Sequence, residues 1–210
     1  MPYFKNNDVN LLFIHIPKTG GTSLESYFSK KYEIPLNPES CFGINRNKTT
    51  QLKETVAINS SLQHMKFETI IKYKKVFNID FNNLTILTIV RNPYERIVSD
   101  LFYFKLIKGK SSKKQVFKAI IAYLMKAKDN HNVPQYMFIT SVNKKFFHEY
   151  KMQILHTETL TSDMHNLGYT DYNYYANANS NKVDYYSYLN KDSIESVSYT
   201  HLTLPTNREV

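Results

Sequence analysis

The chain has 210 residues, and its 27 lysines and arginines outnumber its 18 acidic residues, which gives a formal net charge of +9. This length and a hydrophobic content of 42% fit one soluble α/β domain with a sizeable core. Cys41 is the only cysteine, which excludes an internal disulfide and a cysteine-based zinc site. The positive charge suits an acidic ligand or a nucleic acid, but the basic residues form no single run typical of a nucleic-acid-binding tail.

Residues 10–16 form the first predicted element, a β-rich and nearly all-apolar run typical of a buried parallel strand. The helical spacing of Leu24, Tyr27 and Phe28 then predicts a helix over residues 23–31. Between the two elements stands the turn Pro-Lys-Thr-Gly-Gly-Thr-Ser. Because the N-terminus of a helix attracts anions, this strand–turn–helix order predicts a phosphate-binding loop.

The residue types in this turn suit phosphate binding. Gly20 and Gly21 permit positive φ angles and a close approach of the backbone to an anion. Lys18 adds a mobile positive charge and the hydroxyl groups add hydrogen-bond donors. The predicted phosphate-binding residues are Lys18, Thr19, Gly20, Gly21, Thr22 and Ser23. Since Lys18 precedes the glycines instead of following them, the turn is not a Walker A loop, and an ordinary ATPase or GTPase is disfavoured.

The turn closely resembles the 5′-phosphosulfate loop of sulfotransferases, in particular of the branch that acts on carbohydrate hydroxyls, such as the heparan and chondroitin 2-O-type enzymes. The resemblance implies 3′-phosphoadenosine 5′-phosphosulfate (PAPS) as the sulfuryl donor. It also implies the sulfotransferase fold, an α/β fold with a P-loop-like parallel β-sheet flanked by helices. No metal is required by this chemistry, and no cluster of ligand residues in the sequence suggests one.

His64 lies between this loop and the next motif, where the resemblance places a catalytic histidine. An imidazole with a pKa near ~6.5 can accept the proton of an attacking hydroxyl. We therefore expect His64 to act as the general base, and Lys18 to stabilise charge on the departing bridging oxygen. His15, at the end of the first strand, is the competing base, and a purely structural role for His64 also remains open. Residues 33–60 are expected to form loops over the site.

Residues 84–90 predict a second buried strand, which is followed directly by Arg-Asn-Pro-x-x-Arg-x-x-Ser. Pro93 suits the start of a helix. Arg91 and Ser99 could then converge on one phosphate, with the guanidinium and the hydroxyl as donors. This motif resembles the 3′-phosphate-binding motif of sulfotransferases. The alternative is that Arg91 is a surface charge paired with Glu95.

The remaining pattern continues the alternation of strands and helices, which predicts a parallel sheet with helices on both faces and a ligand at the carboxyl ends of its strands. Further helices are expected over 113–128, 158–164 and 193–197, and a strand over 152–156. Weaker matches to the family follow in the same order. They are residues 133–136, 156–160, 175–180 and 185–189.

The predicted function is transfer of a sulfuryl group from PAPS to a carbohydrate hydroxyl, with an acidic glycan as one possible acceptor and no nucleic-acid partner. The alternatives are a P-loop nucleotide kinase and a noncatalytic nucleotide-phosphate binder. A kinase needs an aspartate at a strand end to hold Mg²⁺, whereas the second strand here ends in Arg91.

We expect one sulfotransferase-like domain over residues 1–199. The Thr-rich stretch 200–210, which has no helical period, is expected to be a non-native or disordered tail. No secretory leader or membrane-spanning stretch is evident, which together with the single cysteine predicts a cytoplasmic protein of a bacterium or a virus. Eukaryotic carbohydrate sulfotransferases are usually anchored in the Golgi, so a Golgi location would require an anchor outside this sequence.

Overall fold

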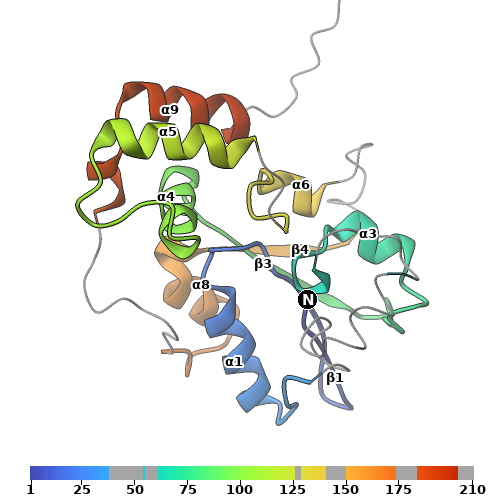
Figure 1. Cartoon of the computed structure of the whole chain (residues 1–210). Helices are drawn as coiled ribbons and strands as arrows, with labels where there is room; N and C mark the ends of the chain where they lie inside the picture. The colour runs from blue at the N-terminus through green and yellow to red at the C-terminus, as the bar shows by residue number, and fades with distance from the viewer. Residues whose placement is uncertain (38–53, 55–60, 126–128, 141–149, 174–183, 203–210) are drawn as a thin grey trace, which may run out of the picture.

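The computed structural model describes residues 1–37, 54, 61–125, 129–140, 150–173 and 184–202. Its centre is a four-stranded sheet in the order β1-β2-β3-β4 (Figure 1). β2, β3 and β4 run parallel to one another, as expected from the sequence. The strands are β1 (Tyr3–Lys5), β2 (Asn10–Ile14), β3 (Thr85–Val90) and β4 (Met152–His156).

β1 precedes residues 10–16, the first element that the sequence predicts. It pairs antiparallel with β2, with Tyr3 opposite Leu12 and Lys5 opposite Asn10. A strand of three residues is too short to show a two-residue periodicity, so only its pairing with β2 reveals it.

Helices flank the sheet, and each predicted helix has a counterpart (Figure 1). The helix expected over 113–128 ends at Leu124, and residues 126–128 lie outside the described part of the chain. The α-helices are α1 (Gly21–Lys31), α3 (Phe67–Lys72), α4 (Pro93–Tyr103), α5 (Lys113–Leu124), α6 (Tyr136–Ile139), α8 (Leu160–Asn166) and α9 (Lys191–Val197). The shorter helical turns are η1 (Leu62–His64), η2 (Thr157–Thr159), η3 (Tyr185–Tyr188) and the π-helical η4 (Ser198–Leu202).

Both faces of the sheet are buried. Residues 11–14 of β2 are all buried, and successive residues of a strand point to opposite faces. On one face, Leu12 and Ile14 pack with the apolar residues of α3 and α6. On the other face, Leu11 and Phe13 pack with α1 and α8. A third apolar cluster joins α4, α5 and α9 beyond the sheet (Figure 1). Cover on both faces explains why β2 and β3 are nearly continuous apolar runs.

The parallel arrangement brings the carboxyl ends of three strands to one edge. Val90 at the end of β3 lies opposite His156 at the end of β4, and Ile14 at the end of β2 lies opposite Thr88 of β3. The segments that follow these strands therefore meet at this edge, where α/β proteins bind ligands.

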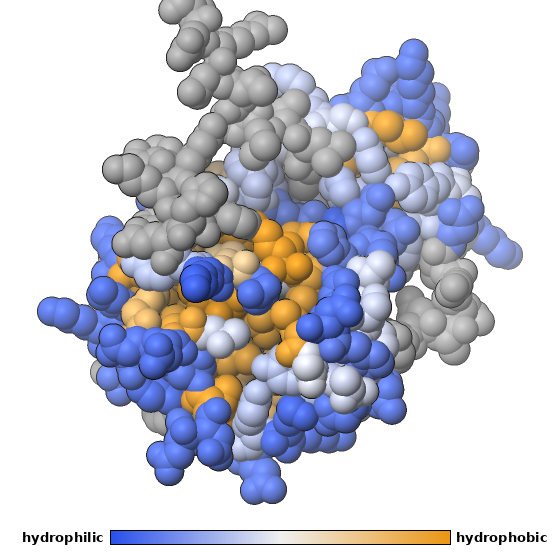
Figure 2. All heavy atoms as spheres, turned by 180° about the vertical axis from the view of Figure 1, so that it is seen from behind, coloured by the Kyte–Doolittle hydropathy of each residue, from blue (hydrophilic) through white to orange (hydrophobic). Residues whose placement is uncertain are grey.

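The side seen in Figure 2 carries an apolar area with hydrophilic side chains around it. The hydrophilic surroundings reflect the large number of charged residues in the chain. Over the described residues, no helix has both the length and the apolar composition needed to cross a membrane. The loop predicted over 33–60 and the polar stretch 175–180 lie largely outside the described residues, as do residues 203–210 of the predicted tail. The domain limit at residue 199 stays a prediction.

Candidate active site

The first predicted phosphate loop is a tight turn between β2 and α1. Its backbone enters the left-handed region at Lys18 (φ 64°) and at Gly20 (φ 90°). The buried Thr19 hydroxyl donates a hydrogen bond to the Ile16 carbonyl oxygen at 2.9 Å, which closes the turn. The N-cap residue of α1, Gly20, has no side chain that could accept from the N–H groups of the first turn. N–H groups at the positive end of a helix are the kind of donors that attract an anion, in keeping with the predicted phosphate-binding loop.

The side chains of the loop have different exposures. Thr22 is exposed in the first turn of α1, whereas Ser23 is buried and its N–H donates to the Gly20 carbonyl at 3.0 Å. The Thr19 hydroxyl is already used within the turn, so Thr19 can offer a phosphate only its backbone N–H. The sequence-based expectation of hydroxyl donors along the loop is therefore best met by Thr22.

His15 supports the loop from below. A Cβ atom at Gly21 would lie 2.6 Å from His15 Nε2, so the ring and the backbone are in direct contact. His15 Nδ1 lies 2.5 Å from the buried Glu25 carboxylate. Burial alone would raise the pKa of the Glu25 carboxyl, but the adjacent His15 brings it below its ordinary value. Because His15 Nδ1 is paired with Glu25, His15 is less suited than His64 to act as the base.

Arg91 follows β3 and lies beside the first loop. Its Nη1 donates to the Lys18 carbonyl oxygen at 3.4 Å, and its guanidinium carbon lies 4.8 Å from the centre of the Tyr185 ring. Arg91 also forms the ion pair with Glu95 that the alternative interpretation of the sequence expected, with Nη2 3.1 Å from Glu95 Oε2. However, the side chain is only 13% exposed and is not a surface charge. Its Nε is buried and has no hydrogen-bond partner among the residues that the structure describes.

Gln135 fixes the backbone of Arg91 from both sides. Its Oε1 accepts the Arg91 N–H at 2.9 Å, and its Nε2 donates to the Arg91 carbonyl oxygen at 2.7 Å. This contact explains the Pro-Gln element at residues 133–136, which the sequence marked only as a weak match. The side chain of Arg91 thus leaves a backbone that is held in place.

The segment after β4 joins the two loops. The Thr157 hydroxyl lies 2.7 Å from the Thr19 carbonyl oxygen and 3.1 Å from that of Val90. Glu158 Oε1 accepts the N–H of Asn92 at 2.6 Å. All three carboxyl ends of the parallel strands therefore contribute to one connected site.

Arg96 is a residue whose role the sequence did not indicate. It is 1% exposed, and its guanidinium donates to three carbonyl oxygens. The acceptors are those of Pro17 at 2.9 Å, Val133 at 3.0 Å and His131 at 2.6 Å. Burial lowers the pKa of Arg96, but an arginine stays protonated in proteins. Arg96 thus ties the phosphate loop to the segment before α6.

The Lys18 ammonium is a second positive charge of the site, beside that of Arg91. Its Nζ lies 4.5 Å from the centre of the Tyr103 ring, and the pKa of Lys18 is lowered by burial and further by the nearby Arg91. Ser99, the other predicted phosphate ligand, lies half-buried on α4, and its hydroxyl makes no hydrogen bond with the part of the chain that the structure describes. The site therefore holds two cationic side chains, Lys18 and Arg91, and the Ser99 hydroxyl as a further donor.

His64 is buried in η1, close to His15 and to a third histidine, His131. Its Nδ1 lies 3.2 Å from the His15 carbonyl oxygen, so Nδ1 carries the proton and Nε2 keeps a lone pair. The ring centres of His15 and His131 lie 4.9 and 5.1 Å away. Burial, with these two rings next in importance, lowers the pKa of His64 to about 2. The imidazole is therefore neutral, and its proton affinity in this environment is low, which by itself disfavours a role as base.

His131 is held by a buried chain of polar groups. Its Nδ1 lies 2.7 Å from Asp100 Oδ1, and the Tyr123 hydroxyl donates to Asp100 Oδ2 at 2.8 Å. The Tyr103 ring stacks on His131 at 5.6 Å, and this same ring contacts Lys18. The sequence indicated this buried chain of polar groups only through the position of His131 a few residues before the Pro-Gln element.

The site suits a ligand with two separated phosphate groups. Lys18 and Arg91 lie on two loops that touch, and Arg91 Nε, which has no acceptor in the described part of the chain, is a buried donor for an anionic oxygen. The turn before α1 adds backbone donors around the other cation. These features fit the 5′- and 3′-phosphates of PAPS, and the residue that directly follows β3 is Arg91, whereas a Mg²⁺-dependent kinase needs an aspartate at a strand end.

Comparison with known proteins agrees with this geometry. The model of the Sulfotransferase family matches residues 1–199. No curated protein and no solved structure shows a significant match. The match spans both phosphate loops, β4 and the helices that pack around them. The chain therefore belongs to the sulfotransferase family, whose members are PAPS-dependent enzymes.

Proposed function

We propose that this sulfotransferase transfers the sulfuryl group of PAPS to a hydroxyl of a carbohydrate, with His64 as general base. The observation that carries the proposal is the contact between the two phosphate loops, where Arg91 Nη1 donates to the Lys18 carbonyl oxygen at 3.4 Å. The proposal assigns Arg91 to the 3′-phosphate, and it assigns the adjacent Lys18 and the N-terminus of α1 to the 5′-phosphosulfate.

The residues have distinct parts in donor binding. The backbone donors of Thr19, Gly20 and Gly21 and the hydroxyl of Thr22 would hold the 5′-phosphosulfate at the start of α1. Arg91 would hold the 3′-phosphate, with the Ser99 hydroxyl as a further donor. The role of Ser23 would be limited to its position inside the first turn, because its side chain is buried.

The chemistry is an in-line displacement at sulfur. The acceptor hydroxyl oxygen forms a bond to sulfur, while the bond from sulfur to the bridging oxygen of the 5′-phosphate breaks and its electron pair stays on that oxygen. His64 Nε2 takes the hydroxyl proton, and the Lys18 ammonium stabilises the charge that develops on the bridging oxygen. The products are a sulfate ester and adenosine 3′,5′-bisphosphate.

His64 is suited to this role by its tautomer. The His15 carbonyl orients the ring and fixes the proton on Nδ1, which leaves Nε2 as the basic atom. The low pKa keeps the ring neutral before the donor binds. A bound polyanion nearby would raise its proton affinity, so the ring would become a stronger base where it is needed.

The carbohydrate acceptor rests on the likeness of the two loops to the carbohydrate branch, and an acidic glycan would be favoured by the net charge of +9. The single cysteine supports a reducing compartment such as the cytoplasm. The reaction as proposed needs no metal.

Calorimetric titration tests donor recognition directly. We expect adenosine 3′,5′-bisphosphate to bind at least ~10-fold more tightly than adenosine 5′-phosphate or ATP, because only it offers a charge-assisted contact to Arg91. Transfer of radiolabelled sulfate from PAPS to a panel of desulfated glycans then tests the reaction and its acceptor. Equal binding of ATP and the bisphosphate would contradict the donor assignment. Specific binding without transfer to any glycan would favour a noncatalytic binder or another acceptor class.

A further inference from the structure

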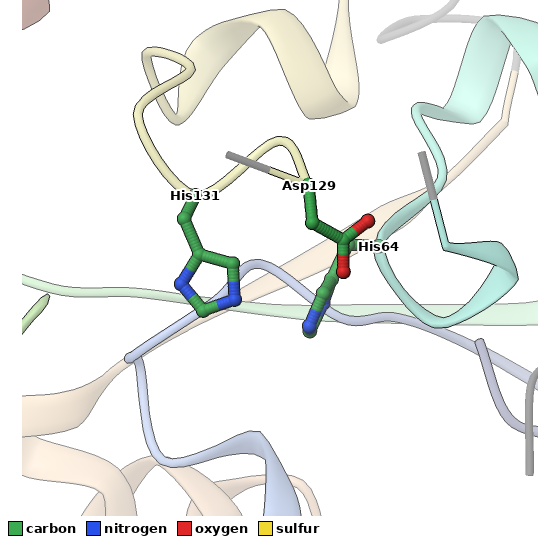
Figure 3. Close-up of side chains that lie close together, drawn as sticks. All are labelled: His64, Asp129 and His131. Atoms are coloured by element: carbon green, nitrogen blue, oxygen red, sulfur yellow. The ribbon is translucent and has the colours of Figure 1, made fainter. Parts of the chain in front are cut away.

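His64 also belongs to a group of three metal-ligating side chains, together with Asp129 and His131 (Figure 3). One ligand atom from each residue lies within 4.8 Å of the other two. The residues come from η1 and from the segment between α5 and α6, so they are distant in sequence and meet only in the fold. Both histidines are buried and Asp129 is exposed, which leaves the group open to solvent on one side.

Both imidazoles present the same nitrogen as a free ligand. His64 Nδ1 donates to the His15 carbonyl oxygen at 3.2 Å, and His131 Nδ1 donates to Asp100 Oδ1 at 2.7 Å. Each Nε2 therefore keeps its lone pair. A hydrogen bond from the second ring nitrogen to a carbonyl or carboxylate is the usual support of a metal-bound histidine, and here both rings have one.

Asp129 supplies the charge. One carboxylate oxygen, Oδ1, accepts the N–H of Ser61, and the next residue, Asn130, donates from its side chain to the His64 carbonyl oxygen at 2.8 Å. These two bonds tie the segment of Asp129 to η1. The exposed carboxylate keeps its second oxygen for a cation.

We propose that His64, Asp129 and His131 bind a divalent transition-metal ion of the Zn²⁺ type, and that this ion inhibits sulfuryl transfer. Two imidazole nitrogens and one carboxylate oxygen are ligands that zinc accepts, and three protein ligands leave a fourth position open. With zinc bonds of about 2.0–2.2 Å, ligand atoms lie roughly 3.3 Å apart, so the widest separation must close by about 1.5 Å. Asp129 is the exposed member of the group and its side chain can rotate toward the ion.

The inhibition follows from competition for one lone pair. The ion would occupy His64 Nε2, the atom that accepts the hydroxyl proton in the proposed function. This part of the inference rests on the proposed function, whereas binding of the ion does not. The site is therefore inhibitory, which is consistent with a reaction that needs no metal.

Binding is measured without reference to activity. Chelator-treated protein is titrated with Zn²⁺ by calorimetry and with Co²⁺ by visible absorption, which reports the coordination geometry of the ion. We expect one ion per chain and a rise in the thermal midpoint with Zn²⁺, since a ligand of the folded state stabilises it. Less than half an ion per chain, or Co²⁺ absorption identical to that of the buffer, would overturn the site.

Variants connect the ion to these residues. Asp129→Asn is the main test variant, because it removes the negative charge but keeps an oxygen that can accept the Ser61 N–H. We expect this variant to bind Zn²⁺ at least ~10-fold more weakly than the wild type. His131→Asn should have a similar effect, although His131 is buried and its variant must first show a cooperative thermal transition. His165→Asn is the matched control, since His165 Nε2 is bonded to the Tyr172 carbonyl oxygen at 3.0 Å outside the group, and it should bind Zn²⁺ normally. Equal affinity in Asp129→Asn and wild type would overturn the assignment.

Activity separates the two parts of the inference. Zn²⁺ should inhibit transfer in the wild type at the concentration at which it binds, and Asp129→Asn should require at least ~10-fold more. Stoichiometric binding without any inhibition would overturn the competition with the base. The proposed function itself fails separately, through the absence of PAPS-dependent transfer in metal-free protein.

Discussion

The side chain of Gln135 makes two hydrogen bonds with the backbone of Arg91. It accepts the Arg91 N–H at 2.9 Å and donates to the Arg91 carbonyl oxygen at 2.7 Å. The two residues are 44 positions apart, and α6 begins immediately after Gln135. The contact fixes the point at which the Arg91 side chain leaves β3, so its guanidinium is directed by a rigid backbone. Pre-organisation of this kind lowers the entropy lost when an anion binds.

Arg91→Ala should weaken the binding of adenosine 3′,5′-bisphosphate about 10- to 100-fold and leave adenosine 5′-phosphate nearly unaffected. A hydrogen bond to a charged group contributes about 1.5–3 kcal/mol, and only the first ligand carries the 3′-phosphate. Calorimetric titration of both ligands checks this. Glu95→Gln is the control, because it removes the ion pair at 3.1 Å and keeps the guanidinium, so it should bind as tightly as wild type or more tightly. Parallel weakening of both ligands in Arg91→Ala would assign Arg91 a structural role.

Lys18→Ala should lower kcat by at least ~10²-fold while affecting the affinity for adenosine 3′,5′-bisphosphate much less. The reason is that the Lys18 charge matters most as the bridging oxygen departs, in the transition state. Steady-state kinetics and product titration measure the two effects. If affinity and turnover fall by the same factor, Lys18 contributes only to binding.

The pH dependence of kcat/KM provides an independent test of Lys18. Its pKa is lowered by burial, so the ammonium loses its proton at a lower pH than an ordinary lysine. Activity should therefore begin to fall on the alkaline side before pH 10.4, the ordinary lysine value. Lys18→Arg, which stays charged, should retain a flat alkaline limb at whatever activity it keeps. An identical alkaline limb in both proteins would assign it to another group.

His64→Ala should fold and bind the donor product, yet transfer sulfuryl at least ~10²-fold more slowly. His15→Ala, by contrast, should reduce donor-product affinity and thermal stability, because the ring contacts Gly21 and pairs with Glu25. Single-turnover rates and product titration of both variants distinguish a base from a positioning residue. Near-wild-type turnover in His64→Ala would transfer the role of base to another group.

Gly21→Ala should destabilise the fold by about 1–3 kcal/mol, as overpacking does, because its Cβ would meet His15 Nε2 at 2.6 Å. The ring cannot move aside without breaking its bond to Glu25. Chemical denaturation measures the loss. Gly109→Ala is the control, since the nearest atom to its Cβ, the Tyr188 hydroxyl, is 4.0 Å away. Comparable stability of Gly21→Ala and Gly109→Ala would show that the loop yields easily.

Arg96→Met should destabilise the fold by at least ~3 kcal/mol. It leaves three carbonyl oxygens without a donor, and each unsatisfied buried group costs about 1–3 kcal/mol. Urea denaturation with and without the donor product measures the change. A loss below ~1 kcal/mol would mean that water replaces the guanidinium.

The sequence by itself determined the elements whose signals are local. The two apolar strands, the glycine turn before α1 and the proline at the start of α4 are all set by neighbouring residues, and the structure confirms the elements they predicted. The candidate phosphate-binding residues Lys18 and Arg91 could be chosen in the same way, because Arg91 directly follows a buried strand and Lys18 lies in the turn after another.

Only the tertiary structure decided how these elements meet. Arg96 donates to the Pro17 carbonyl oxygen 79 residues away, and His64 donates to the His15 carbonyl oxygen 49 residues away. A periodicity in the sequence cannot indicate contacts at such separations. The same holds for β1, whose three residues become a strand only through pairing with β2. Local patterns encode which backbone conformation a segment prefers, whereas burial of an arginine or the tautomer of a histidine depends on partners that chain folding brings near.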